Sequence, residues 1–134
     1  MPLSLTKDSI DLGIITTNAD AMLEFYQGVL GFDLHSKADR PGSTMYRLAC
    51  GTSLIKIVQF DDEPAAKAPG GGLQGATGYR YWTISVDNVD EMASACEAAG
   101  YKVPMPPFDI EPGLRITMVQ DPDGNWVEFI QRGE

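Results

Sequence analysis

Four residues at spaced points of the sequence have side chains that can hold or move a proton: Asp11, Lys56, Tyr81 and Glu128. Glutamate, lysine and tyrosine act as acids and bases in catalysis, and burial in a cleft can move their pKa values toward neutrality. Glu128 as a general base, with Tyr81 or Lys56 stabilising an enolate-like intermediate, would support an isomerase or lyase reaction. The alternative is a polar lining without chemistry, in which Asp11 forms an ion pair with Lys56 and Tyr81 donates to Glu128.

Further residues are candidates for a ligand-binding cleft, because small-molecule pockets combine apolar and aromatic walls with a few placed polar groups. Thr83 and Trp126 lie close in sequence to Tyr81 and Glu128. Arg47 and Arg115 hold comparable places in the two halves of the chain and could clamp a carboxylate, although a surface arginine is the commoner outcome. The aromatic and apolar candidates for the wall are Trp126, Tyr81, Met45, Ile15 and Ile130.

The charge of the chain excludes some classes of partner. Ten Lys and Arg residues against nineteen Asp and Glu give a formal charge of −9, which would repel nucleic acids and anionic lipid surfaces. An acidic cleft would instead suit a cationic guest. No apolar run approaches the roughly 20 residues that span a bilayer, and residues 1–8 lack the apolar segment of a signal peptide, so we expect a cytoplasmic protein.

The first half of the chain predicts one helix and four strands. The β-branched stretch 9–16 is typical of a strand, and Asn18 is the expected cap of a helix over 19–30, whose apolar residues recur at helical spacing until Gly31. Strands are predicted at 32–39, 44–49 and 53–60, separated by Pro-Gly and Gly-Thr turns.

The second half repeats this order after a linker at 61–78, which is rich in glycine, proline and alanine and which we expect to be flexible. A strand at 79–86 precedes a helix that Asn88 should cap and Gly100 should end, with a buried stripe of Val89, Met92, Ala93, Cys96 and Ala99. Strands follow at 102–108, 114–120 and 125–131. The offset of roughly seventy residues exceeds common solenoid periods and indicates a duplicated module.

Strand alternation places the chemical residues on one side of the sheet, because side chains two apart share a face. If the apolar face of each strand packs under the helix, Asp11, Lys56, Tyr81 and Glu128 all lie on the opposite face. We therefore predict a single α+β domain over 1–134, made of two tandem βαβββ modules (9–60 and 79–131). Their mixed sheets would curve around a cleft lined by these residues. Cys50 and Cys96 have no CxxC spacing and are predicted core thiols.

Three motifs carry a resemblance to a known family. They are Phe-Tyr-Gln-Gly-Val-Leu-Gly-Phe at 25–32, Val-Asp-Asn-Val-Asp at 86–90, and Asp-Pro-Asp-Gly-Asn at 121–125 followed by Glu128. With the duplication, they resemble the vicinal oxygen chelate superfamily, also called the glyoxalase/bleomycin resistance/extradiol dioxygenase fold, over about residues 9–131. The motifs are fairly specific for the fold and say much less about the reaction.

The resemblance implies a metal held by four His or Glu side chains, at positions that fall on Asp11, Lys56, Tyr81 and Glu128. Of these, only Glu128 matches. A lysine ammonium has no lone pair and repels a cation, and a neutral tyrosine is a poor ligand. The sole histidine, His35, is not at a family ligand position, so we predict that the usual metal site is lost and no cofactor is bound.

Three functions remain open on this resemblance. The first is binding of a small molecule without catalysis, as in family members that sequester antibiotics. The second is a metal-independent isomerase or lyase that uses Glu128 as acid or base on a carbonyl-bearing small molecule. The third is an ordinary metal-dependent glyoxalase- or dioxygenase-type enzyme with other ligands. Because family members often form homodimers, and some build the cleft from modules of two chains, a homodimer is also expected.

Overall fold

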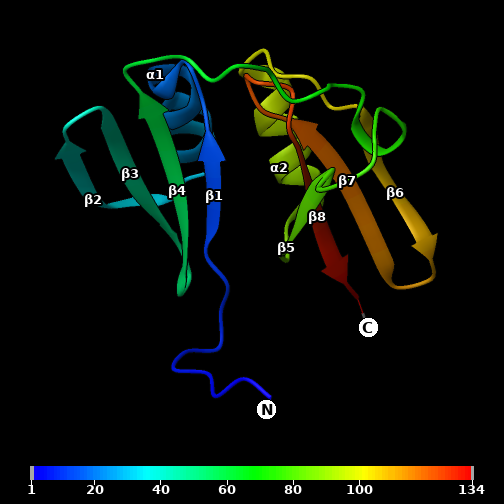
Figure 1. Cartoon of the computed structure of the whole chain (residues 1–134). Helices are drawn as coiled ribbons and strands as arrows, with labels where there is room; N and C mark the ends of the chain where they lie inside the picture. The colour runs from blue at the N-terminus through cyan, green and yellow to red at the C-terminus, as the bar shows by residue number, and fades with distance from the viewer. Residues whose placement is uncertain (1, 134) are drawn as a thin grey trace. The chain divides into compact units, whose positions relative to one another are not determined.

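The chain forms two compact units, each with one four-stranded mixed sheet, which confirms the predicted pair of βαβββ modules (Figure 1). The structure is a computed structural model that describes residues 2–133. The first unit extends to Ala65 and the second begins at Ala66, inside the predicted linker. The helices of the described chain are all too short or too polar to cross a membrane.

The first unit has the strand order β1-β4-β3-β2. Strand β1 is parallel to β4, and the other neighbouring strands are antiparallel. Its elements are β1 (Leu12–Ile15), α1 (Ala19–Leu23), η1 (Glu24–Val29), β2 (Asp33–Arg40), β3 (Ser43–Cys50) and β4 (Ser53–Phe60).

The second unit repeats this topology with the order β5-β8-β7-β6, and β5 is parallel to β8. A short 3-10 helix, η2, precedes the first strand. The elements are η2 (Gly72–Gln74), β5 (Tyr81–Ser85), α2 (Val89–Ala98), β6 (Met105–Glu111), β7 (Leu114–Gln120) and β8 (Trp126–Arg132).

The first helix departs from its prediction because it changes type after one turn. Residues 19–30 were expected to form one regular helix, whereas α1 continues as the π-helix η1. The Leu30 N–H donates to the Phe25 carbonyl at 3.0 Å, five residues back. The wider turn accompanies two adjacent, fully buried aromatic residues, Phe25 and Tyr26, whose rings meet edge to face at 4.8 Å between centroids.

The second helix packs through the predicted stripe over the sheet of its unit. Val89, Ala93 and Cys96 are buried, whereas Ala99 is exposed. Burial raises the pKa of the Cys96 thiol to about 11, so this thiol stays protonated and behaves as the small core residue that was predicted.

The N-terminal caps of the two helices were predicted only in part. Asn18 accepts from the Ala21 N–H at 3.2 Å, as expected, but the Asn88 side chain bonds Glu91 instead of a backbone amide. In each unit a glutamine at the end of the last strand also supplies an acceptor. Gln59 accepts from the Ala19 N–H and Gln131 from the Val89 N–H, both at 2.9 Å.

The glycine-rich linker has more order than its composition predicts. The Arg80 guanidinium donates to three carbonyls, those of Pro69, Gly70 and Gly72, at 2.7 to 3.0 Å. Residues 61–71 are exposed. Arg80, just before β5, therefore holds residues 69–72 in place, and the predicted flexibility does not extend to this part of the linker.

Candidate functional site

The helix-free face of the first sheet carries two neighbouring cations. Strand register places Lys56 between Gly13 on β1 and Arg47 on β3, and Arg47 faces Ser36 on β2. The Arg47 Nη1 donates to the Ser36 hydroxyl at 3.4 Å. The structure thus brings together two of the predicted site residues, Lys56 and Arg47, in one row across the sheet. We call this row, Gly13-Lys56-Arg47-Ser36, the cationic row.

The next row on the same face is apolar. Ile15 pairs in register with Val58, Val58 with Met45, and Met45 with Ala38. Ile15 is 48% exposed although it is a large aliphatic residue. This apolar row therefore lies directly beside the cationic row, and it contains two of the predicted wall residues, Ile15 and Met45.

Asp11 has a different partner from the one predicted. Its carboxylate accepts from the Lys7 ammonium at 2.7 Å and from the Leu54 N–H at 2.8 Å. These bonds, first that of Lys7 and then that of Leu54, lower the pKa of Asp11, and Lys56 makes only the smallest contribution. The expected Asp11–Lys56 ion pair is thus replaced by an Asp11–Lys7 pair, and the basic character of the cationic row is retained.

The helix-free face of the second sheet carries an acid and its hydroxyl partner. Thr83 and Glu128 are register partners on β5 and β8, and the Thr83 hydroxyl donates to Glu128 Oε1 at 2.7 Å. Tyr81 is the register partner of Trp126 and is 49% exposed. The predicted Tyr81–Glu128 bond is therefore replaced by a Thr83–Glu128 bond, although Tyr81, Thr83, Trp126 and Glu128 share one face.

Trp126 is held from two sides within the second unit. Its indole N–H donates to the Gln120 side chain at 3.1 Å. Gly72 of η2 lies so close to the indole that a Cβ at this position would overlap the six-membered ring. The ordered end of the linker therefore covers part of the indole, a contact that the sequence did not indicate.

Arg115 lies on the helix-bearing face of the second sheet. Its guanidinium forms ion pairs with Asp90 of α2 at 2.9 Å and with Asp109 of β6 at 3.2 Å. Its register partner is Gln131, whose side chain reaches the start of α2. Because Met118 is the register partner of Glu128, as Arg47 is of Lys56, the expectation that Arg47 and Arg115 hold equivalent places is wrong.

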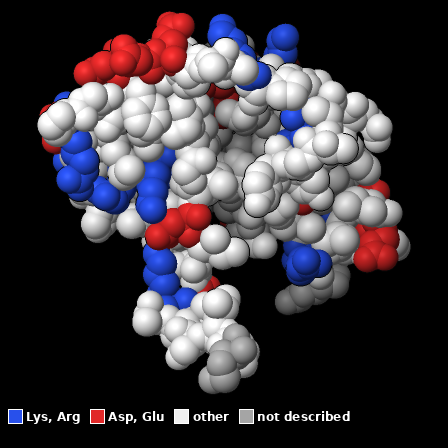
Figure 2. Space-filling view, viewed as in Figure 1, with Lys and Arg blue, Asp and Glu red and all other residues white. Residues whose placement is uncertain are grey.

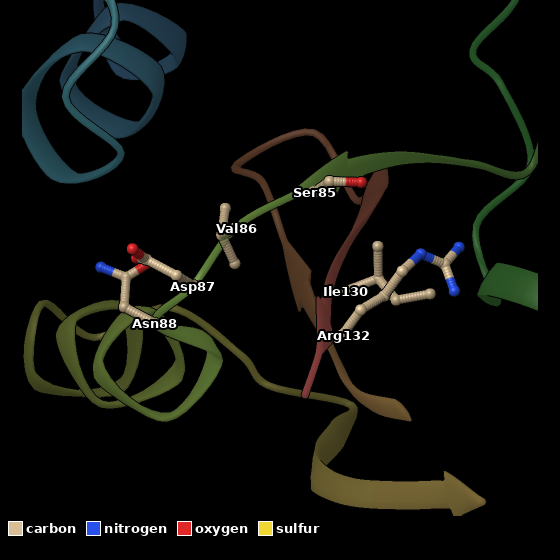
Figure 3. Close-up of a pocket in the computed structure, with 6 residues that line it drawn as sticks. All are labelled: Ser85, Val86, Asp87, Asn88, Ile130 and Arg132. Carbon is tan, nitrogen blue, oxygen red and sulfur yellow. The ribbon is translucent and has the colours of Figure 1, made fainter. Parts of the chain in front are cut away.

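A shallow hollow of about 520 Å³ lies where β5 and β8 end (Figure 3). Ser85 and Ile130 enter it from the face that carries Glu128, and Asp87 and Arg132 add opposite charges. The complete lining is Ser85, Val86, Asp87, Asn88, Ile130 and Arg132. Arg132 was not predicted as a site residue, although alternation along β8 places it on the same face as Glu128.

The residues at the four family positions do not fit a transition metal. Such metals prefer several imidazole, thiolate or carboxylate ligands, whereas Lys56 offers an ammonium beside the Arg47 guanidinium. Within residues 2–133, no group of three or more His, Cys, Asp or Glu side chains is placed to hold a metal ion.

Comparison with known sequences decides the family. The model of the Glyoxalase/Bleomycin resistance protein/Dioxygenase superfamily matches residues 9–129. The chain belongs to this superfamily. No curated protein matches the sequence with significance.

Several solved structures share the fold at low sequence identity. A glyoxalase family protein from Bacillus cereus superposes with a TM-score of 0.82 at 16% identity, over 98% of this chain and 100% of that one. TioX from Micromonospora sp. ML1 gives 0.71 at 24% identity, over 94% and 99%. Glyoxalase I from Zea mays gives 0.77 at 24% identity over 92% of this chain, which spans only 44% of the maize protein.

Proposed function

We propose that this superfamily member binds a small organic molecule on the helix-free faces of its sheets, without the usual metal, and sequesters an antibiotic or a metabolite. The observation that supports this most is Lys56, which stands beside Arg47 at a family ligand position. Two cations on one row repel a metal ion, but they do not prevent a small organic molecule from binding.

The composition of the two faces also supports a binding role. The first sheet offers an apolar row beside its cationic row, and the second offers Tyr81 and Trp126 beside Glu128. Apolar and aromatic walls with a few convergent polar groups are typical of small-molecule sites.

Tryptophan fluorescence tests the proposal. We expect cationic drugs, aromatic metabolites or aromatic acids from a panel to change the emission of Trp126, and we expect the change to disappear in Trp126→Phe. Trp82→Phe is the matched control, because Trp82 alternates with Tyr81 and Thr83 and therefore lies on the other face of β5. No change at high micromolar ligand in the intact chain would count against a binding role.

A second candidate is a metal-independent isomerase or lyase on a carbonyl-bearing small molecule. One specific contact favours it: the Thr83 hydroxyl fixes one oxygen of Glu128, which leaves the other oxygen for a substrate proton. In this reaction Glu128 would be the base, and Tyr81 or Lys56 would stabilise the enolate-like intermediate.

Two further measurements separate these proposals from the remaining possibilities. Metal analysis of protein purified without chelators or a His-tag should find no stoichiometric transition metal, and such a metal would overturn the proposal in favour of an ordinary metal enzyme. Sedimentation analysis should find the homodimer that we propose from superfamily membership.

A further inference from the structure

We infer that Lys56 and Arg47 bind the carboxylate of an organic acid whose apolar part lies along Ile15 and Met45, the two residues of the apolar row that flank the buried Val58. This inference rests on the proposed small-molecule function and names its ligand class. It also reverses, for the first sheet, the expectation of a cationic guest that the net charge of the chain suggested.

The two cations are an unfavourable pair unless an anion joins them. Lys56 and Arg47 are direct register partners, and side chains at such positions have Cβ atoms only about 4.5–5.5 Å apart, where like charges destabilise a sheet. The ion pairs among residues 2–133 involve Lys7, Lys37 and Arg115 as cations, and include neither Lys56 nor Arg47. A bound carboxylate would remove this repulsion.

The surrounding carboxylates do not neutralise the pair. Asp11 is bonded to Lys7 and to the Leu54 N–H, and the attraction between Asp11 and Lys56 makes the smallest contribution to the lowered pKa of Asp11. Figure 2 shows Lys and Arg side chains gathered over β2, β3 and β4 on the side away from α1. The first sheet is thus locally basic although the chain carries a charge of −9.

Room for the ligand exists beside Lys56. Its register partner on β1 is Gly13, and a Cβ added at Gly13 would meet no atom within 4 Å. Gly13 is not among the glycines with positive φ, so a side chain at this position is not strained. The strand therefore leaves open space at Gly13, the register partner of Lys56, and a longer side chain at position 13 would fill it.

The arginine is suited to a planar carboxylate. One guanidinium nitrogen of Arg47 donates to the Ser36 hydroxyl in a long bond of 3.4 Å, which leaves the other N–H donors available. A guanidinium binds a carboxylate through two parallel hydrogen bonds, and the Lys56 ammonium adds a point charge from the side.

The neighbouring row specifies an organic acid over a bare inorganic anion. Ile15, Val58 and Met45 lie two residues along their strands from Gly13, Lys56 and Arg47, and therefore on the same face. An apolar body of a few carbon atoms attached to the carboxylate would cover Ile15, which is 48% exposed, and burial of that surface would add to affinity.

The test uses three probes that share one apolar body: 4-phenylbutanoate, 4-phenylbutanamide and 4-phenylbutylamine. Each probe, and inorganic phosphate as a bare anion, is titrated into the full chain while backbone amide shifts are followed by NMR. We expect the acid to bind about tenfold more tightly than the amide, with the largest shifts at Gly13, Lys56 and Arg47, because charge-assisted bonds add about 1.4 kcal/mol or more. The amine should bind most weakly on this face.

Variants test the two cations separately from the fold. Lys56→Gln and Arg47→Gln should each weaken binding of the acid by about tenfold and leave binding of the amide unchanged. Lys37→Gln is the matched control, since Lys37 pairs in register with Tyr46 on the opposite face and lies over its ring. Gly13→Leu should block the acid, whereas Gly13→Ala should retain it.

The outcomes separate this inference from the proposed function. Equal or tighter binding of the amide or amine at Lys56 and Arg47, unchanged affinity in both glutamine variants, or preferential binding of inorganic phosphate over the acid would overturn the carboxylate site. If the amide or amine instead shifts Tyr81, Trp126 and Glu128 while the acid shifts nothing in the first sheet, the inference fails and the proposed small-molecule function stands. If none of the probes binds to either sheet, the inference is overturned. That result would also count against the proposed small-molecule function.

Discussion

Lys56 and Glu128 occupy equivalent positions in β4 and β8 but carry opposite charges. Each is three residues before the glutamine that contacts the helix start of its unit. Their register partners differ as well, because Lys56 faces Gly13 on β1 and Glu128 faces Thr83 on β5. At the residue scale the duplicated framework therefore presents a basic face in one copy and an acid held by a hydroxyl in the other.

Replacement of Glu128 tests whether the second sheet performs catalysis. If the chain turns over a carbonyl-bearing compound, Glu128→Gln should abolish turnover, with a loss of at least about 100-fold, while ligand affinity and fold stay nearly intact. Steady-state rates and binding constants measured on the same preparations decide this. Glu97→Gln, at an exposed position of α2, is the control, and wild-type activity in Glu128→Gln would remove Glu128 from the mechanism.

Replacement of Asp11 should destabilise the protein in a pH-dependent way. The Lys7 bond and the Leu54 N–H lower the pKa of Asp11 below its ordinary value of 3.8. A lowered pKa in the folded state means that the stabilisation is fully present above about pH 4 and is lost as the pH falls through the folded-state pKa. Asp11→Asn should therefore lower the free energy of unfolding at neutral pH and have a smaller effect in acid.

Denaturant unfolding at about pH 7 and at about pH 2 measures this difference. Asp8→Asn, at a nearby exposed position, is the matched control. An equal effect of Asp11→Asn at both pH values would show that the carboxylate charge does not stabilise the fold.

At the scale of elements, the two glutamine contacts make a matched pair of predictions. Gln59→Ala and Gln131→Ala each leave a helix-start N–H, that of Ala19 or Val89, without its acceptor. Each should lower the free energy of unfolding by about 1 kcal/mol, as for the loss of a helix cap. Gln27→Ala, exposed in η1, should change it little; equal effects for all three would contradict a capping role.

The contact of η2 with Trp126 predicts a different behaviour for two glycines that both have positive φ. Gly72→Ala adds backbone strain and drives a methyl group into the indole, whereas Gly78→Ala adds strain only, because nothing lies within 4 Å of its Cβ. We expect Gly72→Ala to change Trp126 emission and lower stability by more than Gly78→Ala. Identical spectra and stabilities would show that η2 does not rest on the indole.

The sequence predicted elements best where the pattern is strictly local. The strands at 53–60 and 114–120 match their predicted bounds, and Gly31 and Gly100 have the positive φ expected at helix ends. The π-helix was missed because its apolar spacing is that of a regular helix. The order of residues 69–72 was missed because it depends on Arg80, which lies beyond the segment.

At the scale of the whole molecule, the boundary between the units predicts where a protease cuts. Residues 61–71 are exposed, and Lys67 is the only lysine or arginine among them. Limited trypsin digestion should therefore cleave first after Lys67, and mass spectrometry should find two fragments that meet there. A first cut after Lys102 instead would show that the segment between α2 and β6 is more accessible to the protease than the linker.

For the candidate site, strand alternation predicts which side chains share a face of the sheet, but it does not predict their partners on other strands. Alternation correctly placed Tyr81, Thr83, Trp126 and Glu128 on one face, but the partner of Glu128 depends on the register of β5 with β8, which no single strand encodes. Local charge was likewise hidden, since a chain with a net charge of −9 still sets Lys56 beside Arg47.

The glutamine contacts also couple the local unfolding of each helix to the local unfolding of its sheet. Gln59 and Gln131 stand in the last strand of each unit, so the amides of Ala19 and Val89 lose their acceptors only when the helix start and the strand end separate. In hydrogen exchange, these two amides should then be protected as strongly as those of β4 and β8, although helix starts normally fray. Each helix and its sheet would open as one cooperative unit.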